Sequence, residues 1–322
     1  MYPFIFKPIL KEIIWGGTNI LPFKGLTPSE DKIAESWELS HVEGNYSVVV
    51  NGDLKGLTIA ELISRYGARL TGEKVIHRFG DTFPLLIKFI DACDNLSIQV
   101  HPDDVLARAR HKSLGKTEMW YVVKAAPDAS LYCGFSQPID ADEYVRRVED
   151  QSIIDVLSRY EVKEGDVFYL PAGRIHAICA GCFVAEIQQT SNITYRIYDY
   201  HRKDANGNSR ELHTGLAKEA IDFKVLPDYR TFYKPTPNQV IPLVQCTYFT
   251  TNLLELDRAI ERNHTGLDSF VIYICLKGTA ILQDEYKNKL TVQQGQTVLI
   301  PAMIRNLTIT PESPTKLLET YL

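Results

Sequence analysis

The stretch that decides the fold runs from Gly165 to His176 and reads GDVFYLPAGRIH. Its apolar centre, from Val167 to Leu170, predicts a short strand. Pro171 and Gly173 then favour a tight turn, because proline restricts φ and glycine tolerates positive φ. We therefore expect a second strand to begin at His176, with the imidazole directed into the interior of a β unit.

A related stretch lies near the C-terminus. Residues 162–172 read VKEGDVFYLPA, and residues 292–302 read VQQGQTVLIPA. They share a valine, a glycine, a Pro-Ala pair and the same apolar alternation. A repeat at one offset predicts two similar all-β units. In the second copy, however, Met303 replaces the turn glycine and Asn306 replaces the histidine.

Composition shifts divide the chain. Four prolines between Pro227 and Pro242 indicate a linker. We expect a first unit over residues 1–226, a linker over 227–244 and a second β unit over 245–322. Apolar spacing also predicts helices over residues 58–66 and 140–160, so the predicted fold class is mainly β with additional helices.

Bulk properties exclude several classes of protein. The 322 residues carry a formal net charge of -5, which argues against a nucleic-acid partner. Nowhere does an apolar run approach the roughly 20 residues that span a bilayer, so no membrane association is expected. The N-terminus lacks the features of a signal peptide, and the six cysteines form no disulfide-framework pattern. The expected compartment is the cytoplasm.

Four side chains are candidate metal ligands. Gln99 and His101 are two residues apart, so on a strand they face the same side. Glu118 and His176 would complete a set with two imidazoles, one carboxylate and one amide oxygen. This set without thiolate suits zinc best, one ion per chain, although manganese, iron(II) or cobalt fit the same donors. The alternative is that the histidines are separate core residues. Because Asn306 replaces the histidine, we expect the second unit to hold no metal.

Cys179 and Cys182 form a CxxC pair, which can bind zinc or act in redox chemistry. No second CxxC accompanies it, and Ala180-Gly181 is suited to a two-residue hairpin turn. We interpret the cysteines as residues that flank this turn.

These motifs resemble known families. The spacing Gly-x5-Pro-x-Gly-x-x-His resembles the second cupin motif, with Ala180 where the family usually has asparagine. The whole chain resembles the shorter bacterial type I mannose-6-phosphate isomerases in the following runs: LLIKFIDA (85–92), LSIQVHPD (96–103), GKTEMWY (115–121) and TYRIYDY (194–200). The resemblance implies two cupin-like jelly-roll barrels, zinc at the four positions above, and a catalytic arginine at Arg196. It also implies a small phosphosugar substrate, interconverted between mannose 6-phosphate and fructose 6-phosphate.

An aldose–ketose isomerisation needs an acid/base group and a group that stabilises the developing oxyanion. Arg196 suits the oxyanion or the phosphate. Glu186 has the strand parity that faces inward, although a buried structural carboxylate is nearly as good an interpretation. Lys116 is the first choice for phosphate contact and an additional catalytic candidate. Further candidates for substrate binding are Lys88, Trp15, Arg174 and Arg202, while Arg210 suits a surface role equally well.

Two alternatives stay open. An iron(II) cupin oxygenase uses a similar barrel, but four protein ligands leave little room for oxygen, and oxygen consumption would reveal it. A non-catalytic sugar-binding bicupin would bind ligand without interconverting it. The sequence does not distinguish a monomer from a homodimer.

Overall fold

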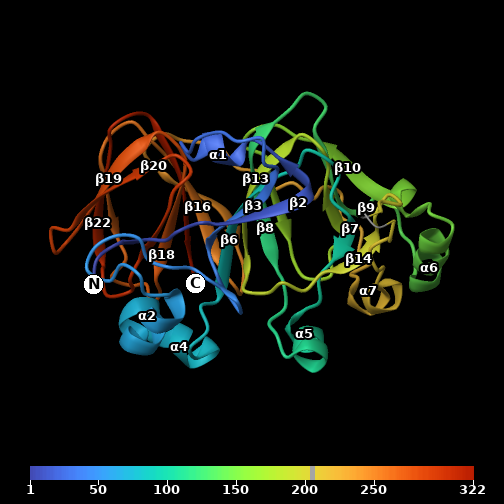
Figure 1. Cartoon of the computed structure of the whole chain (residues 1–322), viewed down its shortest axis with the longest axis horizontal. Coiled ribbons are helices and arrows are strands. Elements are labelled where there is room, and N and C mark those ends of the chain that lie inside the picture. Colours follow the sequence, from blue (N-terminus) through green and yellow to red (C-terminus); the bar gives the residue numbers. More distant parts are fainter. Residues whose placement is uncertain (204–206) are drawn as a thin grey trace.

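The computed structural model describes residues 1–203 and 207–322 and is mainly β. Four large antiparallel sheets follow one another along the long axis of the molecule (Figure 1). Two of them belong to the N-terminal half of the chain and lie on the right of the view. The other two are built mainly from the C-terminal part and lie on the left. We call them the first and second sheet pairs.

The first sheet pair contains a six-stranded and a five-stranded sheet. The order in the six-stranded sheet is β11 (Val167–Leu170), β8 (Glu118–Ala125), β13 (Cys182–Gln189), β6 (Leu85–Asp91), β3 (Ile33–Leu39) and β2 (Ile9–Gly17). The order in the five-stranded sheet is β10 (Leu157–Glu161), β9 (Ser130–Phe135), β12 (His176–Ile178), β7 (Ile98–Val100) and β14 (Tyr195–Tyr198). Trp120, Leu131, Phe168 and Val184 belong to one buried core that joins the two sheets.

The second sheet pair repeats this arrangement. One sheet runs β1 (Phe4–Ile5), β21 (Thr297–Ile300), β18 (Val271–Lys277), β23 (Thr315–Tyr321), β16 (Thr250–Leu256) and β15 (Val240–Gln245). The other runs β17 (Ile260–Asn263), β22 (Asn306–Pro311), β19 (Thr279–Asp284) and β20 (Lys289–Gln293). The order β11-β8-β13-β6 is thus matched by β21-β18-β23-β16, and β10-β9-β12-β7 by β20-β19-β22-β17. A small hairpin pairs β4 (His41–Val42) with β5 (Asn45–Tyr46).

Jelly-roll barrels were expected, yet no sheet closes on itself among residues 1–203 and 207–322. The two sheet pairs are also not separate along the chain. Phe4 of β1 pairs with Leu299 of β21, so the first strand lies in a sheet of the second pair. One apolar core, which includes Phe89, Phe183 and Phe270, connects the two pairs. The first and last segments of the chain therefore fold together.

Helices lie at the margins of the sheets. They are α1 (Ile20–Phe23), α2 (Ile59–Tyr66), α3 (Ala68–Thr71), α4 (Glu73–Phe79), α5 (Asp104–His111), α6 (Ala141–Glu149) and α7 (Thr214–Ala220), with a 3-10 turn at Ile153–Val156. The prediction of α2 is confirmed, and Thr58 and Glu61 close its N-terminus with a capping box. None of the helices in the described ranges has both the length and the apolarity needed to cross a bilayer.

The predicted helix over residues 140–160 is wrong in its second half. The helix ends at Glu149, and Gln151 adopts a φ of 68°, which an α-helix does not permit. Leu157–Glu161 instead pairs with β9. The apolar spacing continues through this region because both the helix and the strand bury one face, so periodicity alone did not locate the boundary.

Candidate functional site

The turn before His176 places its imidazole between two sheets. Gly173 has a φ of 89°, and a Cβ there would lie 2.9 Å from the carbonyl oxygen of Ala220, so the turn requires glycine. β12 then pairs with β7, which puts His176 directly opposite Gln99. Glu118 approaches from the start of β8 in the facing sheet.

Three of the four predicted ligands, His101, Glu118 and His176, meet at one point, and Gln99 lies beside them. His176 Nε2 lies 3.2 Å from Glu118 Oε1, and His101 Nε2 lies 3.6 Å from Glu118 Oε2. The amide nitrogen of Gln99 lies 3.3 Å from His176 Nε2. The ligand atoms of His101, Glu118 and His176 all lie within 4.8 Å of one another. These three side chains are buried, and the two histidines are therefore not separate core residues.

Backbone carbonyls orient both imidazoles. His101 Nδ1 lies 2.9 Å from the carbonyl oxygen of Ile193, and His176 Nδ1 lies 2.8 Å from that of Arg174. A carbonyl oxygen only accepts, so each Nδ1 carries the proton and each Nε2 presents a lone pair to the centre. This is the usual outer support of a metal-binding histidine.

The centre contains buried acceptors that face one another. His101 Nε2 and both carboxylate oxygens of Glu118 have no hydrogen-bond donor in the described part of the chain. Lys116 Nζ forms an ion pair with Glu118 Oε2 at 3.3 Å, which leaves Oε1 without a positive partner. Unpaired buried acceptors are costly, and a bound cation is the group that satisfies three of them at once.

The protonation states fit the same conclusion. Burial lowers the pKa of His176 to about 4 and lowers the pKa of His101 well below its ordinary value, so both imidazoles are neutral, as a ligand must be. Burial raises the pKa of Glu118 to about 8, although the ammonium of Lys116 opposes this shift. An ionised Glu118 at neutral pH therefore calls for further positive charge beside it.

A cavity of about 170 Å³ opens beside the candidate metal ligands. Most of its lining side chains are polar or charged. They include Trp15, Glu35, Lys88, Ser97, Gln99, Lys116, Trp120, Glu186, Asn192, Thr194, Arg196 and Arg210. The cavity therefore combines both charge signs and buried aromatic rings, and through Gln99 it borders the candidate metal ligands.

Strand register explains the charged row on one wall of this cavity. Glu186 on β13 lies opposite Lys88 on β6 and opposite Trp120 on β8. Lys88 Nζ is 3.3 Å from Glu186 Oε1 and 3.5 Å from Glu35 Oε2. Trp120 Nε1 donates to Glu186 Oε2 at 2.8 Å. A buried ammonium is thus held between two carboxylates.

This row keeps Glu186 and Lys88 charged. Burial opposes ionisation of Glu186, but the ammonium groups of Lys88 and Lys116 and the Trp120 hydrogen bond outweigh it, so its pKa is lowered. Burial likewise disfavours a charged Lys88, but the carboxylates of Glu35 and Glu186 raise its pKa above the ordinary value. At neutral pH Glu186 is therefore an ionised carboxylate in the cavity lining that can accept a proton.

Arg196 enters the cavity from the opposite sheet. It lies on β14 opposite Gln99, and its Nη1 donates to the carbonyl oxygen of Glu211 at 3.0 Å. Its Nε is buried and has no hydrogen-bond partner among the described residues. Arg210 also lines the cavity, and Asp199 holds it through a 2.7 Å hydrogen bond to Nε.

Two predicted substrate-binding residues lie elsewhere. The guanidinium of Arg174 stacks over the ring of Tyr229 at 4.9 Å and donates to the carbonyl oxygen of Tyr169. Arg202 donates to Asp199 and to the carbonyl oxygen of Asn95. Neither is among the residues that line the cavity. The predicted Trp15, Lys88, Lys116, Glu186 and Arg196 all line it.

Several lining residues escaped the sequence analysis. Ser97 stands two residues before Gln99, and Thr194 stands two residues before Arg196. Both lie one residue before a strand, β7 or β14, so the two-residue period of that strand, extended by one residue, is a usable signal. Asn192 lies farther from any named strand, where this period does not apply.

The CxxC pair flanks a turn, as interpreted, but the predicted hairpin is wrong, because β12 belongs to the five-stranded sheet and β13 to the six-stranded sheet. β12 ends at Ile178 and β13 begins at Cys182, with Gly181 at a φ of 86° between them. Burial raises the pKa of Cys182 to about 12, so the thiol is protonated and unreactive at neutral pH.

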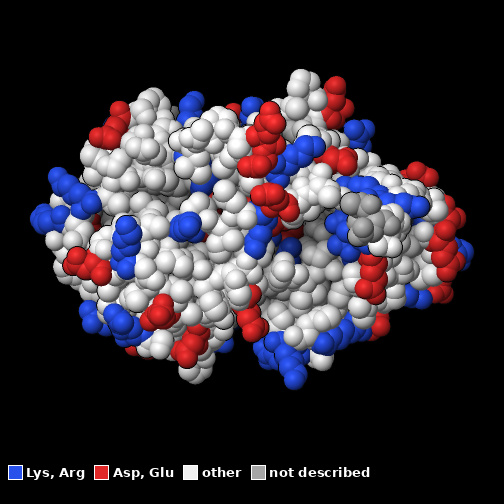
Figure 2. Space-filling view, viewed as in Figure 1, with Lys and Arg blue, Asp and Glu red and all other residues white. Residues whose placement is uncertain are grey.

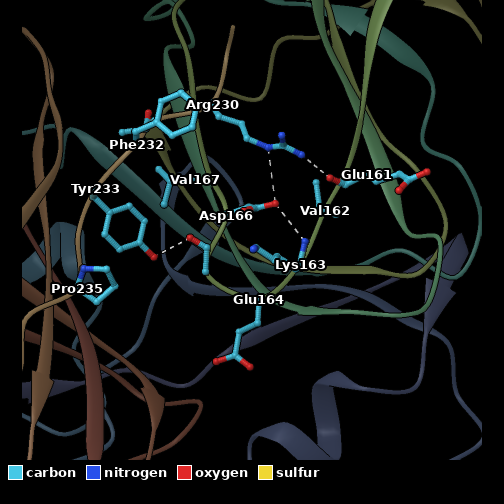
Figure 3. Close-up of a pocket in the computed structure, with 12 residues that line it drawn as sticks. Glu161, Val162, Lys163, Glu164, Asp166, Val167, Arg230, Phe232, Tyr233 and Pro235 are labelled. Carbon is cyan, nitrogen blue, oxygen red and sulfur yellow. Dashed lines mark hydrogen bonds and ion pairs between the residues drawn. The ribbon is translucent and has the colours of Figure 1, made fainter.

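A larger cavity, of about 750 Å³, lies elsewhere in the molecule and has a different character (Figure 3). It is lined by residues 161–167 and by part of the segment 230–235. Its polar groups pair with one another: Tyr233 Oη donates to the carbonyl oxygen of Gly165 at 2.7 Å, and Arg230 donates to that of Glu161. These contacts fasten the segment that joins the sheet pairs, whereas the metal centre leaves its acceptors unpaired.

Comparisons with known proteins agree with this geometry. Residues 4–122 match the family described as phosphomannose isomerase type I, catalytic domain, and residues 239–315 match mannose-6-phosphate isomerase, cupin domain. The mannose-6-phosphate isomerase ManA of Bacillus subtilis (strain 168) is 39% identical over 251 residues, which is 77% of this chain and 78% of that relative. The mannose-6-phosphate isomerase of Streptococcus mutans is 36% identical over 314 residues, or 94% of each chain.

Among solved structures, a mannose 6-phosphate isomerase from Bacillus subtilis superposes with a TM-score of 0.89 and 31% identity, and the match covers 100% of both chains. A mutant of phosphomannose isomerase from Salmonella typhimurium superposes with a TM-score of 0.82 at 15% identity, over 100% of this chain and 99% of that one. The second likeness shows a common fold.

Proposed function

The chain belongs to the mannose-6-phosphate isomerase family, and from that premise we propose that it interconverts mannose 6-phosphate and fructose 6-phosphate in the cavity beside His101, Glu118 and His176. One observation carries this proposal. An ionised carboxylate, Glu186, lines a small cavity together with Gln99, which lies beside the buried group His101, Glu118 and His176. Carbon-acid chemistry beside a carbonyl needs such a base together with a site that binds developing negative charge.

We propose that the cavity holds one zinc ion per chain, bound by Gln99, His101, Glu118 and His176. Two neutral imidazoles, one carboxylate and one amide oxygen form a donor set without thiolate that zinc accepts. The buried acceptors of His101 and Glu118 support this assignment. When bound, the ion supplies a Lewis acid that polarises the sugar carbonyl and its neighbouring hydroxyl.

In the proposed mechanism Glu186 removes the proton from C2 of mannose 6-phosphate and returns it to C1. The Lys88 ammonium and the Trp120 indole hold the carboxylate in place while it is ionised. Lys116 and Arg196 face the same cavity with fixed positive charge, so they stabilise the oxygens that become negative in the enediolate.

The phosphate is assigned to the other end of the cavity. Lys116 was the first choice for this contact, but its ammonium is buried and lies beside Glu118, so we assign it to the reaction centre instead. Arg210 is half-buried and lines the cavity, and Asp199 accepts hydrogen bonds from its Nε and Nη2, which leaves Nη1 to donate to a phosphate. Figure 2 shows Lys and Arg side chains gathered on the face over β7, β9 and β14, which favours an anionic ligand there.

We further propose that residues 1–226 form the catalytic unit and that residues 245–322, after a linker over 227–244, form a degenerate jelly-roll unit without metal. The matching strand order of the two sheet pairs supports a common cupin-like origin. Because β1 pairs with β21, the N-terminal end of the catalytic unit would be ordered only once the second unit has folded against it.

The test is an isomerase assay coupled to consumption of the product, with metal analysis of the same preparation. We expect one zinc per chain, loss of turnover on chelation and recovery on adding zinc. His176→Ala should lower kcat/KM by more than about 100-fold. Mutating a residue that only supports a metal ligand already lowers metal affinity or activity by about 10- to 100-fold. His264→Ala, a buried histidine of the second sheet pair, is the control.

Full turnover by metal-free protein would contradict the proposal. Oxygen consumption by an iron-loaded preparation would favour the oxygenase instead. Saturable binding of the phosphosugar without interconversion would favour a non-catalytic bicupin.

A further inference from the structure

β14, the strand that carries Arg196, is at the edge of its sheet. It pairs with β7 on one side, and on the other side its backbone groups require another partner. A single residue supplies that partner at Arg196. The backbone N–H of His213 donates to the carbonyl oxygen of Arg196 at 2.7 Å, and His213 Nδ1 accepts the backbone N–H of Arg196 at 3.1 Å. At the free edge of β14, His213 therefore forms the two hydrogen bonds to the backbone of Arg196 that a neighbouring strand would otherwise form.

The strand is irregular at this point. Its register with β7 shifts between Arg196 and Tyr198, immediately after the arginine. Such a bulge redirects a side chain but interrupts the regular hydrogen bonds that would hold the strand straight. The contacts from His213 fall on Arg196, the last paired residue before this shift.

The same loop also contacts the side chain. Two residues before His213, the carbonyl oxygen of Glu211 accepts a hydrogen bond from Arg196 Nη1 at 3.0 Å. Arg196 is thus held at its backbone and at one end of its guanidinium, while Nε is left buried with no hydrogen-bond partner in the described ranges. The loop aims the guanidinium and leaves a donor for an anionic ligand.

This loop has a rigid support. His213 occupies the N-cap position of α7, and its carbonyl oxygen accepts the N–H of Ala217 at 2.8 Å. Ala217 is buried in one apolar core with Tyr195 and Ile197, the residues on either side of Arg196. The loop and the strand are therefore fastened to the same core.

We propose that His213 is a positioning residue for the isomerase reaction, acting through Arg196 and without touching the substrate. This rests on the proposed function. The ring must accept through Nδ1, so its contribution is a hydrogen-bond acceptor at that point and not a charge or a proton transfer. Asparagine places an amide oxygen the same number of bonds from Cα as Nδ1 and can replace it, whereas leucine has a similar size and no acceptor.

The test compares His213→Leu with His213→Asn in steady-state assays of the metal-loaded protein. We expect His213→Leu to lower kcat by roughly 10 to 100-fold, because a misplacement of about 1 Å at a reaction centre has effects of that size. His213→Asn should recover activity to near the wild-type value. His41→Leu is the matched control, since His41 Nδ1 also accepts a backbone N–H, from Phe83 at 3.0 Å, outside the cavity lining.

A double-mutant cycle separates positioning from general stability. In an Arg196→Ala background, His213→Leu should cost no further activity beyond about twofold, because the residue through which it acts is gone. An equal loss in both backgrounds would overturn the inference, as would an equal loss in His41→Leu or full kcat in His213→Leu. An inactive wild-type protein, fully loaded with zinc, would overturn the proposed function, and this inference with it.

Discussion

Glu186 in the first sheet pair and Glu319 in the second occupy equivalent positions. Glu186 lies opposite Trp120 on one neighbouring strand and opposite Lys88 on the other. Glu319 lies opposite Tyr273 and Asn252 on the strands that match them in order. The aromatic partner donates to the carboxylate in both, at 2.8 Å from the indole of Trp120 and at 2.6 Å from the hydroxyl of Tyr273.

The two carboxylates differ in whether the protein itself satisfies both of their oxygens. Arg262 donates from Nε and Nη2 to the two oxygens of Glu319, both at 2.8 Å, and Asn252 donates at 3.0 Å. Both oxygens are therefore satisfied by the protein. Glu186 instead faces a cavity, next to acceptors that the described chain does not satisfy. The same buried carboxylate is a structural group in one sheet pair and a candidate base in the other, and its remaining partners decide which.

The candidate metal ligands separate the two pairs further. The register that aligns Trp120 with Tyr273 aligns Glu118 with Val271. His176 corresponds to Asn306, which is exposed and donates to Glu285. The second pair has thus replaced a carboxylate by an apolar side chain and an imidazole by an amide, and a guanidinium, that of Arg262, pairs with its buried carboxylate. Positive charge stabilises the buried carboxylate in each pair, but only the first leaves room for a ligand.

The largest effect should come from the paired substitutions Glu186→Gln and Glu319→Gln. Glu186→Gln removes the proposed base and keeps the shape, so kcat should fall by about 10²- to 10⁴-fold, the range of a general base. Glu319→Gln should leave kcat unchanged because the network does not reach the cavity. Steady-state kinetics of the two zinc-loaded variants measure both. Equal kcat values for the two variants would mean that Glu186 has no catalytic role that Glu319 lacks.

The second prediction concerns the stability that Glu319 provides. Glu319→Gln leaves the Arg262 guanidinium without a counter-charge, and breaking a buried ion pair by removing one partner costs about 3 kcal/mol or more. Because Arg262 is 20% exposed, we expect the lower end of that range. Denaturant unfolding at neutral pH measures the loss, and the conservative Lys316→Arg at a surface ion pair is the control.

The pH dependence of this loss has a definite sign. Burial opposes ionisation of Glu319, but the hydrogen bonds and charge of Arg262 outweigh it, so the folded-state pKa is lowered. A lowered pKa contributes stability that is fully present above the unfolded-state pKa of about 4.3 and is lost as the pH falls through the folded-state pKa. The difference in unfolding free energy between wild type and Glu319→Gln should therefore shrink below about pH 4. A difference that stays constant into acid would show that Glu319 acts through packing alone.

The sequence was informative where the geometry is local. The turn at Gly173 and the two-residue spacing of Gln99 and His101 predicted residues that lie together in the structure, because strand periodicity and glycine φ values depend on adjacent residues. The parity argument for Glu186 succeeded for the same reason. These candidate residues came from local pattern, and the structure brings them together.

The sequence did not predict contacts between segments that are far apart along the chain. Arg202 donates to Asp199 and to the carbonyl oxygen of Asn95, Arg174 stacks on Tyr229, and neither lines the cavity. A basic residue near a motif carries no information about which distant carboxylate or ring it meets. Glu35 shows the converse, since it reaches Lys88 only because β3 pairs with β6. The contacts from His213 to Arg196 also join segments that no sequence periodicity links.

The smallest effect should come from Asn306→His, which restores the missing histidine of the second sheet pair. We expect no second zinc, because Val271 stands where the carboxylate ligand would be needed and the buried carboxylate of Glu319 is already paired with Arg262. The stability should change by less than about 1 kcal/mol, since Asn306 is exposed and loses a single contact with Glu285. Metal analysis of Asn306→His beside the reciprocal His176→Asn measures this, and His176→Asn should lose the zinc. Two zinc ions per chain in Asn306→His would show that the histidine alone separates the sheet pairs, and that the guanidinium of Arg262 does not exclude a metal.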